Sequence, residues 1–132
     1  MKAMAGLLLL ALAATIAASC GLTAVGEGEE ILVRAGERDG EMYFEPKRIV
    51  VPVGATVTFV IRNEGKLDHE FESAERGEAG IEEILIPPGR TRRVVWTAPM
   101  APAVYPVYCD LPGHREAGME LTLEVAAATP AP

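Results

Sequence analysis

Short runs of β-type residues, separated by turn residues, follow one another through most of the chain. Apolar and polar positions alternate most clearly in residues 56–62 and 120–125, as expected for strands with one buried face. Turns rich in proline and glycine, such as residues 52–54 and 87–89, separate the runs. The pattern predicts strands over residues 30–34, 42–44, 48–51, 56–62, 69–72, 81–86, 92–97, 104–109 and 119–126. Short strands at this spacing indicate an all-β Greek-key sandwich or barrel.

The first 19 residues differ from the rest of the chain. Lys2 is their single charge, and an apolar run of leucine and small residues follows it, which predicts a secretory signal peptide. The run is shorter than the roughly 20 residues of a membrane-spanning helix. The residues before Cys20 resemble a lipobox, with Ala17 where leucine is usual, so we expect a lipoprotein signal with Cys20 as the lipid attachment site. Ordinary cleavage after Ser19 and an uncleaved membrane anchor remain as alternatives.

The chain after the predicted signal peptide divides into three parts. Residues 20–29 form a tether, residues 30–126 one folded domain, and residues 127–132, which are only alanine, threonine and proline, a disordered tail. A tether of this length reaches only about 15–18 Å. We therefore expect an exported protein held by a lipid anchor on the extracytoplasmic face of the cell membrane, or a periplasmic one if Cys20 is not acylated.

The charge of the chain excludes one class of function, and its cysteines indicate another. With 19 acidic residues against 12 Lys and Arg, the chain lacks the basic surface that nucleic-acid binding requires. It has two cysteines, Cys20 and Cys109. They either form a disulfide, or Cys20 is acylated and Cys109 is a lone thiol outside the cytoplasm. Such a thiol is oxidised unless something binds it, and a metal ion is the obvious candidate.

The residues around Cys109 supply a complete set of metal ligands. His69 and His114 are the only histidines in the chain, and Met119 is the only methionine after Cys109. Each of these residues alone is more often a packing or surface residue. Together, two imidazoles, one thiolate and a weak axial thioether are the ligands of a type 1 copper site. We therefore predict that His69, Cys109, His114 and Met119 bind one copper ion.

The sequence resembles the cupredoxin family over residues 42–125. The matching features are Phe44-Glu45-Pro46, Val53-Gly54, Arg62-Asn63-Glu64-Gly65, His69-Glu70-Phe71, Pro88-Gly89 and the loop from Cys109 to Met119. Four residues separate Cys109 from His114 and four more separate His114 from Met119, a spacing similar to that of auracyanin and rusticyanin. The resemblance implies a Greek-key β-sandwich of about seven or eight strands. It also implies one-electron transfer by Cu(I)/Cu(II) cycling, without enzymatic activity, in a monomer that docks on redox protein partners.

One departure from the family pattern keeps a second function open. Many cupredoxins have asparagine directly after the first histidine, and this chain has Glu70 there, as in a subgroup associated with metal uptake and homeostasis. The backbone N–H of Glu70 is still expected to reach the Cys109 sulfur. A copper chaperone or sensor is therefore the alternative to an electron carrier.

We also predict the surface through which electrons leave. His69 should be covered, whereas the ring edge of His114 should reach the surface, surrounded by Leu111, Pro112, Ala117 and the segment 99–102. The acidic residues of the region 70–83 are expected to form a solvated face, with a docking patch for a basic partner as the alternative. Arg90, Arg92 and Arg93 are expected to be turn and edge-strand charges.

Overall fold

The computed structural model describes residues 28–127 apart from residues 76 and 78. The predicted signal peptide, Cys20 with most of the tether, and residues 128–132 of the tail lie outside the described residues. Within the described part of the chain, no helix has the length and apolar character needed to cross a bilayer. The strands are β1 (Glu30–Arg38), β2 (Glu41–Glu45), β3 (Arg48–Pro52), β4 (Thr56–Asn63), β5 (His69–Ser73), β6 (Ile84–Ile86), β7 (Thr91–Thr97), β8 (Ala103–Tyr108) and β9 (Glu120–Ala126).

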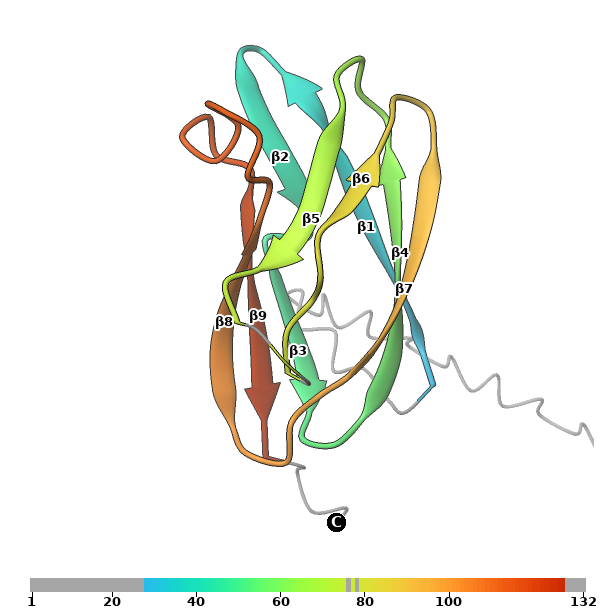
Figure 1. Ribbon diagram of the computed structural model, residues 1–132, viewed down its shortest axis with the longest axis vertical. Coiled ribbons are helices and arrows are strands. Elements are labelled where there is room, and N and C mark those ends of the chain that lie inside the picture. Colours follow the sequence, from blue (N-terminus) through green and yellow to red (C-terminus); the bar gives the residue numbers. More distant parts are fainter. Residues whose placement is uncertain (1–27, 76, 78, 128–132) are drawn as a thin grey trace, which may run out of the picture.

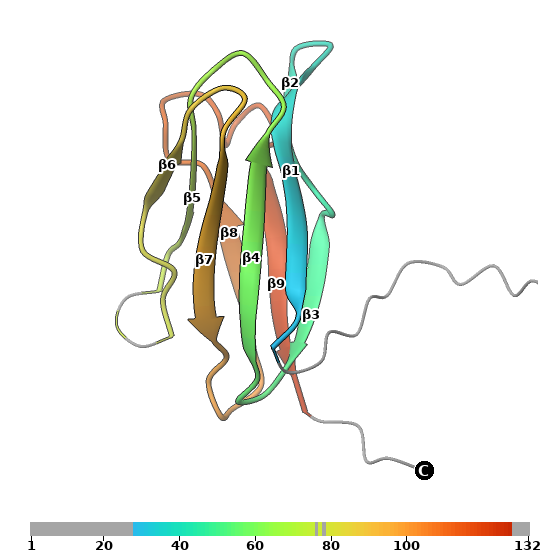
Figure 2. The same ribbon diagram turned by 90° about the vertical axis from the view of Figure 1, so that its right-hand side faces the viewer.

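The strands form the two layers of a β-sandwich (Figure 1). One sheet has the order β2-β1-β4-β7 and the other the order β3-β9-β8-β5-β6. Figure 2 shows β7, β4 and β1 in front of β8 and β9. The chain crosses repeatedly between the layers, and the pairs β1–β4 and β3–β9 are parallel whereas the other pairs are antiparallel. The predicted all-β Greek-key sandwich is confirmed.

Each of the nine predicted runs contains a strand, but several strand boundaries differ from the prediction. The described residues contain nine strands, close to the seven or eight that the resemblance implies. β1 continues to Arg38 instead of ending at residue 34, and Cys109 follows β8 instead of ending it. The predicted run 81–86 is a strand only from Ile84. Ile81 instead donates its N–H to the Ser73 hydroxyl (2.8 Å) and accepts the N–H of Ser73 (3.1 Å). Because a side chain takes the place of a backbone partner, the β5–β6 ladder does not extend to Ile81.

Apolar side chains at alternate positions of the strands fill the space between the two sheets. In β4 the side chains of Val57, Phe59 and Ile61 are buried and the residues between them are not. Phe71 of β5 packs at its centre, with ring centroids 5.4 Å from Phe44 and 5.6 Å from Phe59. This aromatic cluster fixes β5, the strand that begins with His69, against both β2 and β4.

Two groups of loops close the two ends of the sandwich. The end at the top of Figure 1 holds the loops 64–68, 87–90 and 109–119. The segment 99–102 lies at the other end, where the N–H of Gly54 bonds to the carbonyl of Pro99 (3.1 Å). The expectation that segment 99–102 surrounds His114 is therefore wrong. β7 and β8 are joined at the end opposite to the one where β8 leads into Cys109.

Candidate metal centre

Asn63 shapes the loop that leads to His69. Asn63 ends β4, and its side chain is buried because it continues the inward-facing positions of that strand. Its amide nitrogen donates to the carbonyls of Leu67 (2.7 Å) and Ile86 (2.8 Å), and its amide oxygen accepts the N–H of Gly65 (2.9 Å). These three bonds tie loop 64–68 to itself and to β6, and so determine where β5 begins.

Glu37 binds the same loop from β1, which lies in the sheet opposite to that of β5. Its carboxylate accepts the backbone N–H groups of Lys66 (2.9 Å) and Leu67 (3.1 Å), and its Oε1 lies 2.9 Å from Nε2 of His69. Burial raises the pKa of Glu37, but the two backbone N–H groups and His69 outweigh it, so its pKa lies below the usual range. Glu37 is therefore an ionised acceptor at neutral pH.

His69 is completely buried at the start of β5. Burial lowers the pKa of its imidazole, although the neighbouring Glu37 carboxylate acts in the opposite direction. The ring is therefore neutral at neutral pH, which is the state in which an imidazole nitrogen can coordinate a metal. With Nε2 turned to Glu37, Nδ1 faces the interior of the loop cluster.

Cys109 follows β8 directly and is also completely buried. Its N–H bonds to the carbonyl of Met119 (3.2 Å), which joins the two ends of the loop 109–119. Its sulfur accepts the N–H of Glu70 (3.3 Å), as predicted. Burial raises the pKa of the thiol, while the N–H groups of Glu70 and Leu111 lower it. A bound cation would favour the thiolate further.

The loop 109–119 folds back on itself to bring His114 and Met119 to Cys109. The N–H of His114 bonds to the carbonyl of Leu111 (3.0 Å), and the N–H of Met119 bonds to the carbonyl of His114 (3.1 Å). Gly118 has a φ of +100°, a conformation that favours glycine and turns the chain toward β9. The Met119 side chain is completely buried.

The nitrogen and sulfur atoms of three of the predicted ligands, His69, Cys109 and His114, converge on one point. Nδ1 of His114 lies 3.2 Å from Nδ1 of His69 and 3.3 Å from Sγ of Cys109. The three ligand atoms all lie within 4.8 Å of one another, and within the described residues they are the only such group of three or more His, Cys, Asp or Glu side chains. One soft sulfur and two imidazoles match the donor set of a copper site. The residues present therefore fit the predicted metal.

Exposure distinguishes the two histidines. His69 has no exposed surface, whereas His114 is partly exposed, beside the exposed Pro112 and the partly exposed Ala117. Leu111 is partly buried and packs against the core. The predicted difference between the two histidines is therefore present: His69 is covered and His114 reaches the surface.

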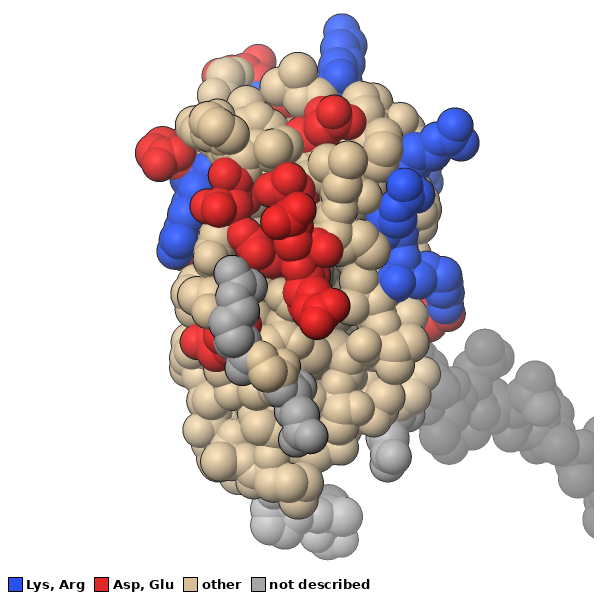
Figure 3. Space-filling model, in the orientation of Figure 1, with Lys and Arg blue, Asp and Glu red and all other residues tan. Residues whose placement is uncertain are grey.

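Acidic and basic side chains gather in two separate regions of the face shown in Figure 3. Acidic side chains gather over β5 and the segment leading to β6, and burial, Glu83, Glu72 and Asp110 together raise the pKa of Glu70. Basic side chains gather over β7, which is an edge strand of its sheet. There Arg93 pairs with Glu30, and Arg92 donates to the carbonyl of Leu85 (3.2 Å).

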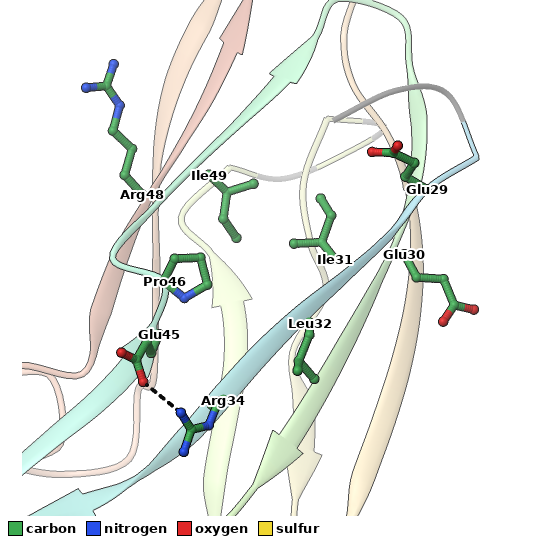
Figure 4. Close-up of a pocket in the computed structure, with 9 residues that line it drawn as sticks. All are labelled: Glu29, Glu30, Ile31, Leu32, Arg34, Glu45, Pro46, Arg48 and Ile49. Carbon is green, nitrogen blue, oxygen red and sulfur yellow. Dashed lines mark hydrogen bonds and ion pairs between the residues drawn. The ribbon is translucent and has the colours of Figure 1, made fainter. Parts of the chain in front are cut away.

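A groove lies away from this centre, between β1 and the junction of β2 with β3 (Figure 4). Arg34 and Glu45 form an ion pair of 3.2 Å across it. The groove contains none of the predicted ligands. Its lining residues are Glu29, Glu30, Ile31, Leu32, Arg34, Glu45, Pro46, Arg48 and Ile49.

The fold is a Greek-key β-sandwich, and two histidines and a cysteine converge at one of its ends. This combination is that of a metal-binding β-sandwich protein. The cupredoxin-like domain family matches residues 6–122. The chain therefore belongs to the cupredoxin-like family, and its fold and His-Cys-His cluster together indicate copper binding.

Individual relatives agree with this family. The chain is 29% identical over 132 residues to the copper-resistant cuproprotein CopI of Pseudomonas aeruginosa, a match that covers 64% of this chain and 72% of the relative. It is 30% identical over 95 residues to the CopI protein of Vibrio cholerae, covering 60% of this chain and 56% of that protein. Reduced auracyanin from Roseiflexus castenholzii has the same fold, with a TM-score of 0.62 at 21% identity, over 77% of this chain and 99% of auracyanin.

Two residues that support the centre had no predicted role: Glu37, and Asn63, which lies in one of the features that match the family. Asn63 continues the inward-facing positions of β4, so the alternation predicts a buried amide there. A buried amide needs hydrogen-bond partners, which is a signal that the sequence does contain. Glu37 is one of many glutamates and lies 32 positions before His69. No local pattern marks it, because only the parallel pairing of β1 with β4 brings it to the loop.

Proposed function

We propose that the chain is a type 1 copper protein that carries single electrons outside the cytoplasm. In this proposal His69, Cys109 and His114 would bind one copper ion, and Met119 would be its weak fourth ligand. The observation that carries the proposal is the convergence of Sγ of Cys109 and Nδ1 of both histidines within 4.8 Å. When bound, copper supplies a one-electron couple between Cu(I) and Cu(II).

The protein's own contribution is to hold the ligands still. The Cys109 sulfur is fixed by the N–H of Glu70, and the loop 109–119 is closed by the bond between Cys109 and Met119. His69, Cys109 and Met119 have no exposed surface, so water is excluded from the inner side of the centre. A site that changes little between oxidation states exchanges electrons with little reorganisation, which favours a carrier.

Electrons are proposed to pass through His114, since it is the partly exposed histidine. A redox protein partner would dock briefly over Pro112 and Ala117, and transient interfaces of this kind are small, below about 1,200 Å² in total. No catalytic step is proposed, because both histidines of the sequence are used in this centre and none remains for a second copper site.

Titration of the purified metal-free protein with Cu(II) tests the proposal. The expected result is an intense visible charge-transfer band from the Cys109 thiolate, saturating at one copper per chain. Cys109→Ser should abolish the band. A surface control such as Val104→Thr, an exposed position at the start of β8 and so at the end of that strand away from Cys109, should leave the band unchanged. A colourless copper complex of the wild-type protein would contradict the type 1 assignment.

Copper handling is the second candidate. Two observations favour it: the relatives are named copper-resistant cuproproteins, and Glu70 follows His69. A copper-handling protein releases its ion to an acceptor, whereas a carrier keeps it in both redox states. Incubating the Cu(I)-loaded protein with a competing chelator separates the two, because rapid and complete loss of Cu(I) would favour handling.

The same proposal includes the cellular location. We propose export by the signal peptide and attachment to the extracytoplasmic face of the membrane through an acylated Cys20, with the domain acting as a monomer. The lipobox-like sequence before Cys20 supports this location. A periplasmic form follows if Cys20 is not acylated.

A further inference from the structure

The Glu37 carboxylate is enclosed by hydrogen-bond donors from three residues. Lys66 and Leu67 donate their backbone N–H groups, and Nε2 of His69 lies 2.9 Å from Oε1. Gly65 leaves room for this arrangement, since a Cβ at that position would collide with the carboxylate. Glu37 of β1 is thus hydrogen-bonded to the loop that leads to His69 and to His69 itself.

This arrangement determines which nitrogen of His69 carries its proton. Each oxygen of the Glu37 carboxylate already accepts a backbone N–H, from Lys66 at Oε2 and from Leu67 at Oε1, so the carboxylate acts as an acceptor and Nε2 of His69 is the donor. Nδ1 then carries the lone pair, and Nδ1 is the atom that lies 3.2 Å from Nδ1 of His114. A carboxylate on the outer nitrogen also increases the electron density of an imidazole ligand.

We propose that Glu37 is a positioning residue of the metal centre, which holds His69 with Nε2 protonated and Nδ1 free to bind, and biases the site toward Cu(II). The bias toward Cu(II) rests on the proposed function, whereas the protonation pattern of His69 does not. The competing explanation is that Glu37 only caps the loop by binding Lys66 and Leu67.

Glu64 provides a matched control within the same loop. Its carboxylate accepts the guanidinium of Arg34 from β1 (2.9 and 2.8 Å), and its N–H bonds to the carbonyl of Ala35 (2.8 Å). Glu64→Gln therefore removes the same charge from a contact that also joins β1 to the loop, without touching His69. Both variants remove a charge from a contact between β1 and the loop, but only Glu37→Gln alters the partner of the imidazole and of the Lys66 and Leu67 N–H groups.

The first experiment uses nitrogen-15 NMR of the metal-free full-length protein. In the wild type, His69 should have a protonated Nε2 whose proton exchanges slowly with water. In Glu37→Gln this exchange should be about tenfold faster or more, because a hydrogen bond to a charged group is worth roughly 1.5–3 kcal/mol. Glu64→Gln should match the wild type. A wild-type His69 protonated on Nδ1, or unchanged exchange in Glu37→Gln, would overturn the proposal.

The second experiment compares the affinities for Cu(II) and Cu(I). Loss of a carboxylate partner weakens metal binding by about 10- to 100-fold, and Glu37→Gln should weaken Cu(II) binding more than Cu(I) binding. Each tenfold difference between the two losses raises the reduction potential by about 59 mV. A loop-capping role alone would weaken both states equally and leave the potential unchanged, which would refute the bias toward Cu(II). If the wild type forms no blue copper site, the NMR result still decides the role of Glu37.

Discussion

Replacing Asn63 by alanine tests the support beneath the metal centre without involving a metal ligand. The Asn63 side chain makes three hydrogen bonds, to the carbonyls of Leu67 and Ile86 and from the N–H of Gly65. All three partners are backbone groups, so removing the amide leaves them without this partner. The perturbation therefore acts on the loop that determines the position of His69.

The magnitude follows from these three contacts. A hydrogen bond of this kind contributes about 1 kcal/mol net, and an unsatisfied buried group costs about 1–3 kcal/mol. Because loop 64–68 lies at the end of the sandwich, water can reach some of the freed groups. We expect Asn63→Ala to lower the free energy of unfolding of the metal-free protein by about 2–4 kcal/mol.

Urea unfolding followed by tryptophan fluorescence measures this loss, since Trp96 is buried in the core. With an m value of about 1–3 kcal/mol/M, the midpoint should fall by about 1–3 M urea. Asn63→Asp should be at least as destabilising at neutral pH, because a carboxylate would face the carbonyls of Leu67 and Ile86. Glu64→Gln should lower the midpoint far less, because a surface ion pair such as Arg34–Glu64 contributes only about 0–1 kcal/mol. An aspartate variant as stable as the wild type would refute the donor role of Asn63.

Four further predictions concern the centre and its surroundings. Met119→Gln should keep copper bound but lower the potential in a redox titration, by about 59 mV for each tenfold gain in preference for Cu(II); an unchanged potential would exclude Met119 as a ligand. Gly65→Ala should lower the free energy of unfolding by about 1–3 kcal/mol, because its Cβ collides with the Glu37 carboxylate; thermal unfolding identical to wild type would contradict this collision. Ala117→Glu should slow electron self-exchange between copper-loaded molecules without changing the visible spectrum, because the added charge repels a second acidic copy beside the partly exposed histidine. Equal exchange rates at matched potential would argue against that exit. Cys20→Ser should move the protein from the membrane fraction to the soluble extracytoplasmic fraction, because the lipid anchor is lost; wild-type protein already in the soluble fraction would rule out the anchor.

Local patterns predicted most of the secondary structure. The alternation in residues 56–62 and 120–125 marked β4 and β9, because a strand with one buried face repeats every two residues. The boundary at Ile81 was wrong for a reason that is not local. Ser73, on the partner strand, takes the N–H of Ile81 with its hydroxyl, and nothing in residues 81–86 indicates this.

The sequence by itself determined the all-β sandwich, the candidate ligands and the closeness of Cys109, His114 and Met119, because those three lie in one short loop between consecutive strands. Only the tertiary structure decided how His69 joins them, since the pairing of β5 with β8 brings its strand beside the one that leads into Cys109. It also decided that Glu37 faces His69 and that segment 99–102 lies at the far end. These contacts depend on the order and direction of strands in the two sheets, and strand order is set by packing of the whole core rather than by any single segment.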